Sequence, residues 1–216
     1  MGQQAHVVID KRVLTPDTFV LRTTKPDGAL AAGQCFSVGT HDLAINREYS
    51  IYSSEHDDGL EFLVRIIEGG AVSSALGKLN PGDSVEIGGP YGSFCLSPEA
   101  RRDNDFVFIA SGTGIAPFSS FARSFPELNY RLVHGIRYEV EEYECEIFKP
   151  GTYFPCVSRP NLGQAPTRVT DWLTNNELDS AALYYLCGNR AMIVDAVQVL
   201  RSKGVPGGNV FMETFF

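Results

Sequence analysis

The segment Arg47-Glu48-Tyr49-Ser50 places a cation, an aromatic ring and a hydroxyl within four residues of an apolar stretch. If this segment is a strand, Arg47 and Tyr49 share one face. An arginine fork binds phosphate, a tyrosine ring can lie on a planar ring system, and a serine hydroxyl can hydrogen-bond its edge. These contacts suit a flavin. Taken alone, the tetrapeptide is more often an ordinary strand with an exposed arginine and a core tyrosine.

A second candidate site lies further along the chain, where Gly69-Gly70-Ala71-Val72-Ser73 opens a predicted helix over 72–78. The first N–H groups of a helix lack partners inside it, and the helix dipole adds positive charge there. Glycine lets an anion approach the backbone, and Ser73 adds a hydroxyl. The segment therefore predicts a phosphate site, with a plain glycine hairpin turn as the alternative.

A glycine turn, Ser111-Gly112-Thr113-Gly114-Ile115-Ala116-Pro117, follows the apolar run 106–110 and precedes a predicted helix over 116–123. Open α/β sheets bind ligands at such a turn, at the carboxyl end of a strand. The turn lacks the glycine spacing of the common dinucleotide fingerprint because residue 117 is proline, and it lacks the lysine of a phosphate-binding loop. It predicts a nucleotide site of a different type.

Two arginines follow two further predicted strands, in His134-Gly135-Ile136-Arg137 and in Val157-Ser158-Arg159. The carboxyl ends of parallel strands meet at one edge of a sheet, so both arginines are expected there. Cationic donors at that edge suit the 2′-phosphate that distinguishes NADPH from NADH. Solvated surface arginines are the alternative.

The chain end, Glu213-Thr214-Phe215-Phe216, supplies a carboxylate and two aromatic rings, and Cys187-Gly188 follows another apolar run. The aromatic rings are suited to covering a planar cofactor, whereas a docked terminal strand is the simpler interpretation. Cys187 is not predicted to be a nucleophile, because a buried cysteine beside a turn glycine is ordinary.

The elements that must position these residues change character near the middle of the chain. Short β-rich runs separated by turns fill the first half and predict a small antiparallel barrel; they are 6–9, 18–22, 60–66 and 84–87. Apolar strands alternating with helices fill the second half and predict a parallel sheet; the strands are 106–110, 130–135, 153–158 and 183–187, and the final helix is 191–203. A helix start is predicted at 170–173, with Thr170 or Asp171 as the cap. The polar segment 97–105 is the expected boundary, which gives domains of residues 1–100 and 101–216.

Composition limits the remaining possibilities. The formal charge of −8 and the pI near 5.0 argue against general nucleic-acid binding. The five cysteines include no C-x-x-C pair, which argues against a structural metal or an iron–sulfur cluster and favours a reducing cytoplasm. The sequence shows neither a signal peptide nor a membrane span.

Taken in order, these motifs resemble the ferredoxin–NADP reductase superfamily over nearly the whole chain, particularly its bacterial-type ferredoxin/flavodoxin–NADP reductases. The resemblance implies an N-terminal antiparallel β-barrel that binds FAD and a C-terminal α/β domain that binds NADP(H), with a C-terminal tail that covers the flavin. It implies hydride transfer between NADPH and FAD, coupled to one-electron exchange with a ferredoxin or flavodoxin. FAD rather than FMN is inferred from the aromatic chain end.

The resemblance also implies a role for each site residue. FAD would be bound by Arg47, Glu48, Tyr49, Ser50, Val64, Arg65, Gly70, Ala71, Val72, Ser73, Thr113, Phe215 and Phe216. NADP would be bound by Gly112, Gly114, Ile115, Arg137, Ser158, Arg159, Arg168, Cys187 and Gly188. Ser50, Cys187 and Glu213 would surround the reacting atoms, and no metal is implied.

Two other functions remain open. The chain could be an NAD(P)H-dependent flavin reductase, or the reductase component of an oxygenase or another complex, because such proteins share every motif above. A nucleotide-sensing subunit that transfers no electrons is less favoured, because Arg47, Tyr49 and Glu213 are all present. Tyr52 stands where this superfamily commonly has a small residue.

Overall fold

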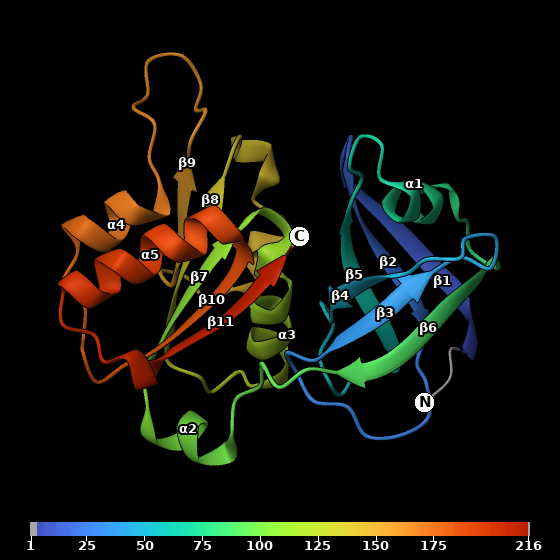
Figure 1. The fold of residues 1–216 in the computed structure, drawn as a ribbon, viewed down its shortest axis with the longest axis horizontal. Helices are drawn as coiled ribbons and strands as arrows, with labels where there is room; N and C mark the ends of the chain where they lie inside the picture. Colours follow the sequence, from blue (N-terminus) through green and yellow to red (C-terminus); the bar gives the residue numbers. More distant parts are fainter. Residues whose placement is uncertain (1–3, 216) are drawn as a thin grey trace. The chain divides into compact units, whose positions relative to one another are not determined.

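The computed structural model describes residues 4–215. The chain divides into two units (Figure 1). The first unit comprises Met1–Cys95 with Ser119–Ser124, and the second comprises Leu96–Phe118 with Phe125–Phe216. Helix α3 (Ala116–Ser124) therefore contributes residues to both units.

The first unit is an antiparallel sheet of six strands in the order β4-β3-β6-β1-β2-β5. The strands are β1 (Gln4–Thr15), β2 (Thr18–Thr24), β3 (Cys35–Gly39), β4 (Arg47–Ser50), β5 (Gly59–Arg65) and β6 (Ser84–Tyr91). The single helix described between these strands, α1 (Ala71–Lys78), lies between β5 and β6 in the chain. The predicted strands and helix are confirmed, and β3 is an additional strand that the sequence analysis did not predict.

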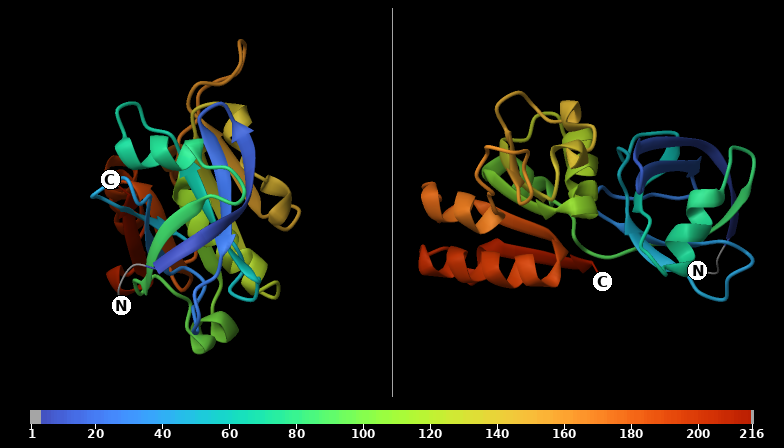
Figure 2. Two further views of the ribbon diagram at one scale, coloured as in Figure 1. Left: turned by 90° about the vertical axis from the view of Figure 1, so that its right-hand side faces the viewer. Right: turned by 90° about the horizontal axis from the view of Figure 1, so that it is seen from above.

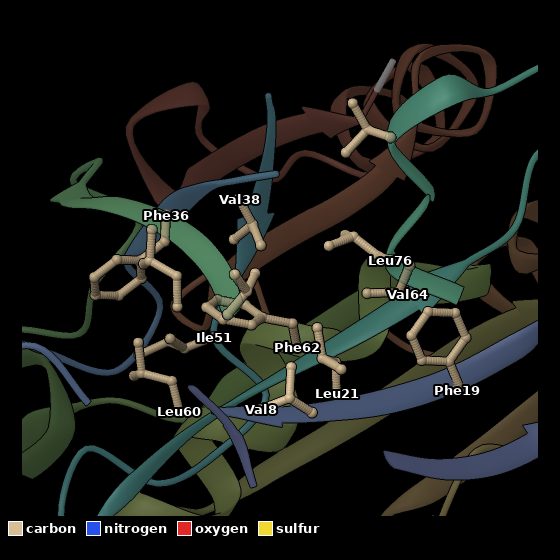
Figure 3. Close-up of a cluster of buried hydrophobic side chains, with 13 residues drawn as sticks. Val8, Phe19, Leu21, Phe36, Val38, Ile51, Leu60, Phe62, Val64 and Leu76 are labelled. Atoms are coloured by element: carbon tan, nitrogen blue, oxygen red, sulfur yellow. The ribbon is translucent and has the colours of Figure 1, made fainter. Parts of the chain in front are cut away.

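The two edge strands of this sheet, β4 and β5, are joined just after the end of β4. Ile51 forms a bridge with Phe62 of β5, and the Tyr52 N–H donates to the Glu61 carbonyl at 2.8 Å. The sheet thus curves back on itself, as the view from above shows (Figure 2). Buried side chains fill its interior, with Phe36, Phe62 and Leu21 among them (Figure 3). Their burial supplies most of the driving force for this unit.

The second unit is a sheet of five parallel strands in the order β11-β10-β7-β8-β9. The strands are β7 (Phe106–Ser111), β8 (Tyr130–Ile136), β9 (Tyr153–Val157), β10 (Leu183–Asn189) and β11 (Val210–Phe215). The helices are α2 (Pro98–Asp103), α4 (Val169–Asn175) and α5 (Arg190–Ser202), with α3 shared as described. The predicted parallel α/β fold is confirmed.

Several local expectations differ from the structure. The polar segment expected to be a boundary contains helix α2, which Ser97 caps by accepting a hydrogen bond from the Ala100 N–H. Helix α4 begins at Val169 with Arg168 as its N-cap, so the predicted Thr170 or Asp171 cap is wrong. Asp171 instead accepts from the Arg168 N–H at 2.7 Å, one turn into the helix. By contrast, residues 210–215 form a sheet strand, β11, in agreement with the simpler interpretation of the chain end.

Among residues 4–215, no helix is long and apolar enough to cross a membrane. The same part of the chain contains no group of three or more histidine, cysteine, aspartate or glutamate side chains placed to hold a metal ion.

Candidate functional site

Strand β4 presents the predicted flavin-binding residues at the edge of the first unit's sheet. Arg47 and Glu48 are exposed, Tyr49 is half-buried and Ser50 is buried. The Tyr49 ring packs on the core with its centroid 6.5 Å from that of Phe62. Burial raises the pKa of Tyr49 to about 12, although the Arg47 charge acts in the opposite direction. Tyr49 therefore stays neutral at physiological pH.

These side chains fit a flavin by their chemistry. The exposed cation Arg47, the partly accessible ring of Tyr49 and the hydroxyl of Ser50 come from one short strand. Arg47 bonds only its neighbour's backbone among the contacts observed in the described residues, through Nη1 to the Asn46 carbonyl at 3.0 Å. Its remaining donors can accommodate a phosphate.

The N-terminus of helix α1 provides a second group of donors in the first unit. Gly70 is its N-cap and contributes no side-chain hydrogen bond, so the first helical N–H groups face outward from the helix end. A Cβ on Gly70 would come within 2.8 Å of Ser73 Oγ and 3.0 Å of the Ile67 carbonyl. Ser73 Oγ accepts from the Ile67 N–H at 3.1 Å, so this hydroxyl shapes the turn.

Two residues implied by the resemblance have structural partners. The Val64 side chain is fully buried in the core, which leaves its backbone as the part able to face a cofactor. Arg65 is 20% exposed and donates to Asp17 Oδ2 from Nε at 3.1 Å and from Nη2 at 2.9 Å. Arg65 therefore also secures the turn between β1 and β2.

Replacing Tyr49 by alanine is expected to weaken flavin retention about tenfold or more, because a stacking ring and its buried area are lost. The measurement is the flavin-to-protein absorbance ratio after gel filtration and dialysis. Tyr49→Phe keeps the ring and should retain the flavin nearly as well. Equal flavin content in Tyr49→Ala and the unchanged protein would remove Tyr49 from the site.

In the second unit, the glycine turn follows β7 as predicted and forms a 3₁₀ turn, Gly112–Ile115, that leads into α3. Gly112 has a φ of 52°, a conformation that favours glycine. Gly114 packs directly against the end of β10, where a Cβ would lie 2.3 Å from the Cys187 carbonyl oxygen. Thr113 is half-buried within this turn.

The end of β7 and the end of β10 are joined by a contact that the sequence analysis missed. Ser111 Oγ accepts from both the backbone N–H and the side-chain amide of Asn189, each at 3.0 Å. Gly188, with a φ of 143°, leaves room for that hydroxyl, because a Cβ there would lie 2.2 Å from Ser111 Oγ. The two predicted glycine motifs therefore form a single interlocked structure.

His134 holds the same turn from β8. This fully buried ring lies 2.8 Å from the Gly112 carbonyl through Nε2 and 2.9 Å from the Tyr153 hydroxyl through Nδ1. A carbonyl only accepts, so Nε2 carries the proton. Burial lowers the pKa of His134 to about 4, so the ring is neutral and Nδ1 accepts from Tyr153.

This burial predicts a pH-dependent loss of stability. Because the folded-state pKa lies below the unfolded value of 6.5, the unfolded chain binds the proton more readily. The contribution of neutral His134 to the free energy of unfolding is therefore fully present above about pH 6.5. It decreases as the pH falls toward 4, and His134 causes no further loss below that. We expect the titration of His134 to lower the free energy of unfolding by about 2 kcal/mol between pH 7.5 and pH 5. Urea unfolding at both values, compared with His134→Gln, measures it, and equal losses in the two proteins would contradict it.

The predicted arginines lie at one edge of the parallel sheet. The Arg159 N–H donates to the Arg137 carbonyl at 2.8 Å, so the ladder between β8 and β9 continues through these residues. Ser158 Oγ donates to the Ile136 carbonyl at 3.1 Å. Arg168 follows Thr167, whose N–H donates to the Val157 carbonyl at 2.8 Å. The expectation of a shared edge for Arg137 and Arg159 is confirmed.

The end of β10 also holds a carboxylate from the last strand. Cys187 pairs in register with Glu213, and its thiol donates to Glu213 Oε2 at 3.8 Å. Burial, together with Glu213, raises the pKa of Cys187 well above its usual value, so it remains a thiol and is a poor nucleophile. Phe215 pairs with Asn189 and is half-buried, whereas the predicted Phe216 lies outside the described residues.

Two domain families match the chain. Residues 5–95 match the oxidoreductase FAD-binding domain, and residues 108–198 match the oxidoreductase NAD-binding domain.

Similar proteins of known role include components of bacterial oxygenases. The electron transfer component of toluate 1,2-dioxygenase from Pseudomonas putida is 31% identical over 201 residues, which span 87% of this chain and 59% of that protein. The reductase component DmpP of phenol 2-monooxygenase from Pseudomonas sp. strain CF600 is 28% identical over 208 residues, or 86% of this chain and 57% of that protein. The chain thus spans less than two thirds of these relatives.

Solved structures show the same fold. A ferredoxin NADP+ reductase from Neisseria gonorrhoeae with bound FAD and NADP matches with a TM-score of 0.86 at 24% identity, over 100% of both chains. The cytochrome P450 reductase GcoB from Amycolatopsis matches with a TM-score of 0.85 at 26% identity, over 99% of this chain and 70% of that one. The chain therefore joins an oxidoreductase FAD-binding domain to an oxidoreductase NAD-binding domain, and it has the fold of the ferredoxin NADP+ reductases.

Proposed function

We propose that the chain is a ferredoxin– or flavodoxin–NADP reductase that uses FAD to couple NADPH oxidation to one-electron exchange with a small redox protein. The observation that supports NADPH is the placement of Arg137 and Arg159 beside each other at the ends of β8 and β9, joined by a backbone hydrogen bond. Paired guanidinium groups at a sheet edge suit a 2′-phosphate.

In the first unit, Tyr49 would contact the face of the flavin ring, and the Ser50 hydroxyl would donate to its edge. Arg47 and the N-terminus of α1 would hold the phosphates, with Glu48, Val64 and Arg65 beside them. When bound, FAD supplies the chemistry of accepting a hydride and releasing single electrons.

In the second unit, the glycine turn would hold the coenzyme pyrophosphate against the backbone, while Arg137, Ser158, Arg159 and Arg168 would bind the adenosine end. Cys187 and Gly188 would border the nicotinamide. Glu213 fixes the Cys187 thiol by accepting its hydrogen bond. Phe215 would cover the flavin ring until the nicotinamide takes its place.

The redox partner must dock on a local basic surface, because the chain carries a formal charge of −8. Three arginines of the first unit are already engaged with carboxylates: Arg12 with Glu61, Arg22 with Asp58, and Arg65 with Asp17.

We place the protein in a reducing cytoplasm, since all five cysteines are free thiols.

Anaerobic titration of the flavin-loaded protein with NADPH and, separately, with NADH tests this proposal. Faster bleaching of the flavin absorbance by NADPH is the expected result. Preference for NADH would remove the roles given to Arg137, Arg159 and Arg168. Bleaching by neither coenzyme would favour a subunit that transfers no electrons.

The reductase component of an oxygenase is the second candidate, because the similar proteins from Pseudomonas carry that role in their names. A reduction assay separates the two functions. Rapid NADPH-driven reduction of a free-standing ferredoxin or flavodoxin supports the first, whereas reduction confined to an oxygenase component supports the second.

A further inference from the structure

A buried carboxylate lies directly behind one of the proposed phosphate-binding arginines. Glu141 belongs to a 3₁₀ turn, Glu139–Glu141, that follows β8, and its side chain is only 4% exposed. Its Oε1 accepts from Arg137 Nε at 3.0 Å and from Nη2 at 2.7 Å. Its Oε2 accepts from the Arg137 backbone N–H at 2.9 Å. Both carboxylate oxygens thus contact the same residue.

This arrangement changes what Arg137 can offer a ligand. One edge of the guanidinium, formed by Nε and Nη2, is directed at the carboxylate. The Arg137 side chain is nevertheless 40% exposed, so an anion can approach its outer edge. The positive charge of Arg137 is largely balanced by the carboxylate of Glu141. The attraction between Arg137 and a bound anion is therefore weaker than it would be for an unpaired arginine.

The neighbouring arginine has a different setting. Arg159 is exposed, and its side-chain hydrogen bond in the described residues is to the Tyr138 hydroxyl, at 3.3 Å from Nη1. The guanidinium carbons of Arg137 and Arg159 each lie 5.9 Å from the Tyr138 ring centroid. The edge of the sheet therefore pairs one charge-balanced arginine with one exposed arginine.

The other carboxylate of the same turn is used differently. Glu139 Oε1 accepts from the Asn161 N–H at 3.1 Å and thereby holds the loop that follows Arg159. This loop, between β9 and α4, extends beyond the sheet (Figure 1). The turn thus contacts Arg137, just after β8, and the loop that follows Arg159, through Asn161.

We propose that Glu141 sets how strongly this protein distinguishes NADPH from NADH, and that it acts through Arg137. The inference rests on the proposed coenzyme role of Arg137. By balancing that charge, Glu141 reduces the gain that a 2′-phosphate brings, so NADPH is preferred only modestly and NADH remains a substrate. Glu141 is a specificity-determining residue that need not touch the coenzyme.

The test compares kcat/KM for NADPH and NADH in the FAD-loaded protein, with ferricyanide as electron acceptor. Glu141→Gln, which keeps the side-chain shape, should raise the NADPH-to-NADH ratio about threefold to tenfold, mainly through KM for NADPH. Arg137→Ala should lower the ratio, and Glu141→Gln should have a smaller effect on it in that background, because the remaining influence of Glu141 is its charge near Arg159. Glu146→Gln removes the same charge from an exposed site in the same acidic segment and should leave the ratio unchanged.

The outcomes separate this inference from the proposed function. An unchanged ratio in Arg137→Ala would show that Arg137 does not contribute to the choice of coenzyme. That result would overturn both the inference and the coenzyme role proposed for Arg137. A lower ratio in Arg137→Ala together with an unchanged or lower ratio in Glu141→Gln would overturn the inference alone.

A measurement on the unmodified protein covers the case in which Glu141→Gln does not fold. Dissociation constants for 2′-phospho-AMP and AMP, measured by isothermal titration calorimetry, should then differ by about tenfold or less. A difference of more than about a hundredfold, which corresponds to an unopposed charge-assisted contact, would contradict the inference.

Discussion

Gly114→Ala is expected to lower kcat/KM for NADPH about a hundredfold or more while the flavin remains bound. A Cβ at this position would lie 2.3 Å from the Cys187 carbonyl oxygen and 2.7 Å from Gly188 Cα. Both are backbone atoms, so the turn must move away from β10. A displacement of about 1 Å at a site that positions a substrate can cost a hundredfold in rate. Steady-state kinetics, together with the flavin-to-protein ratio, measure the effect.

A matched glycine provides the control. Gly208 lies in the 3₁₀ turn before β11, where a Cβ would meet nothing within 4 Å. Gly208→Ala should therefore leave kinetics and flavin content unchanged. If Gly114→Ala were as active as Gly208→Ala, the close contact between the glycine turn and β10 would have no part in coenzyme use.

Glu61→Ala is expected to lower the free energy of unfolding by about 3–5 kcal/mol, the usual effect of removing one member of a buried ion pair. The Glu61 side chain is 8% exposed and lies between two arginines, each with an N–O distance of 2.7 Å: Arg12 from β1 and Arg123 from α3. Burial alone would raise the pKa of Glu61, but hydrogen bonds from Arg12 and Arg123 outweigh burial and lower it. Urea unfolding at pH 7.5, followed by circular dichroism, measures the loss.

An exposed carboxylate offers the comparison for this second variant. Asp58 pairs with Arg22, but its side chain is 87% exposed. Asp58→Ala should change the free energy of unfolding by no more than about 1 kcal/mol, because solvent screens such pairs. Equal losses in the two variants would mean that the Glu61 cluster contributes no more than a surface pair.

The order of elements was predictable because it rests on local signals. Alternating and continuous apolar runs indicated most strands, and glycine punctuation indicated where α1 and α3 begin. Strand β3, Cys35–Gly39, escaped prediction because its residues carry no regular alternation, and its burial comes from pairing with β4 and β6. Helix α2 escaped because its polar residues look like a linker until Ser97 is recognised as its cap.

The candidate site was predictable as a set of motifs but not as a network. The motif around Arg137 indicated a cation at a strand end, yet nothing local indicated that Glu141 turns back to bind it. His134 was part of a recognised motif, but its partner carbonyl at Gly112 is 22 residues away in the sequence. Such contacts depend on which strands are neighbours in the sheet, and that is a property of the whole chain.

Helix α3 bears on whether either half of this protein can exist alone. Its residues Ser119–Ser124 count with the first unit, where Ser119 and Arg123 both bond the Tyr52 carbonyl and Arg123 bonds Glu61. A fragment ended anywhere in 95–105 therefore lacks the segment that satisfies these groups. The flavin-binding half is not contiguous in the chain, so excising it at the apparent boundary should yield an unstable barrel, and supplying 116–124 as a separate peptide should partly restore it.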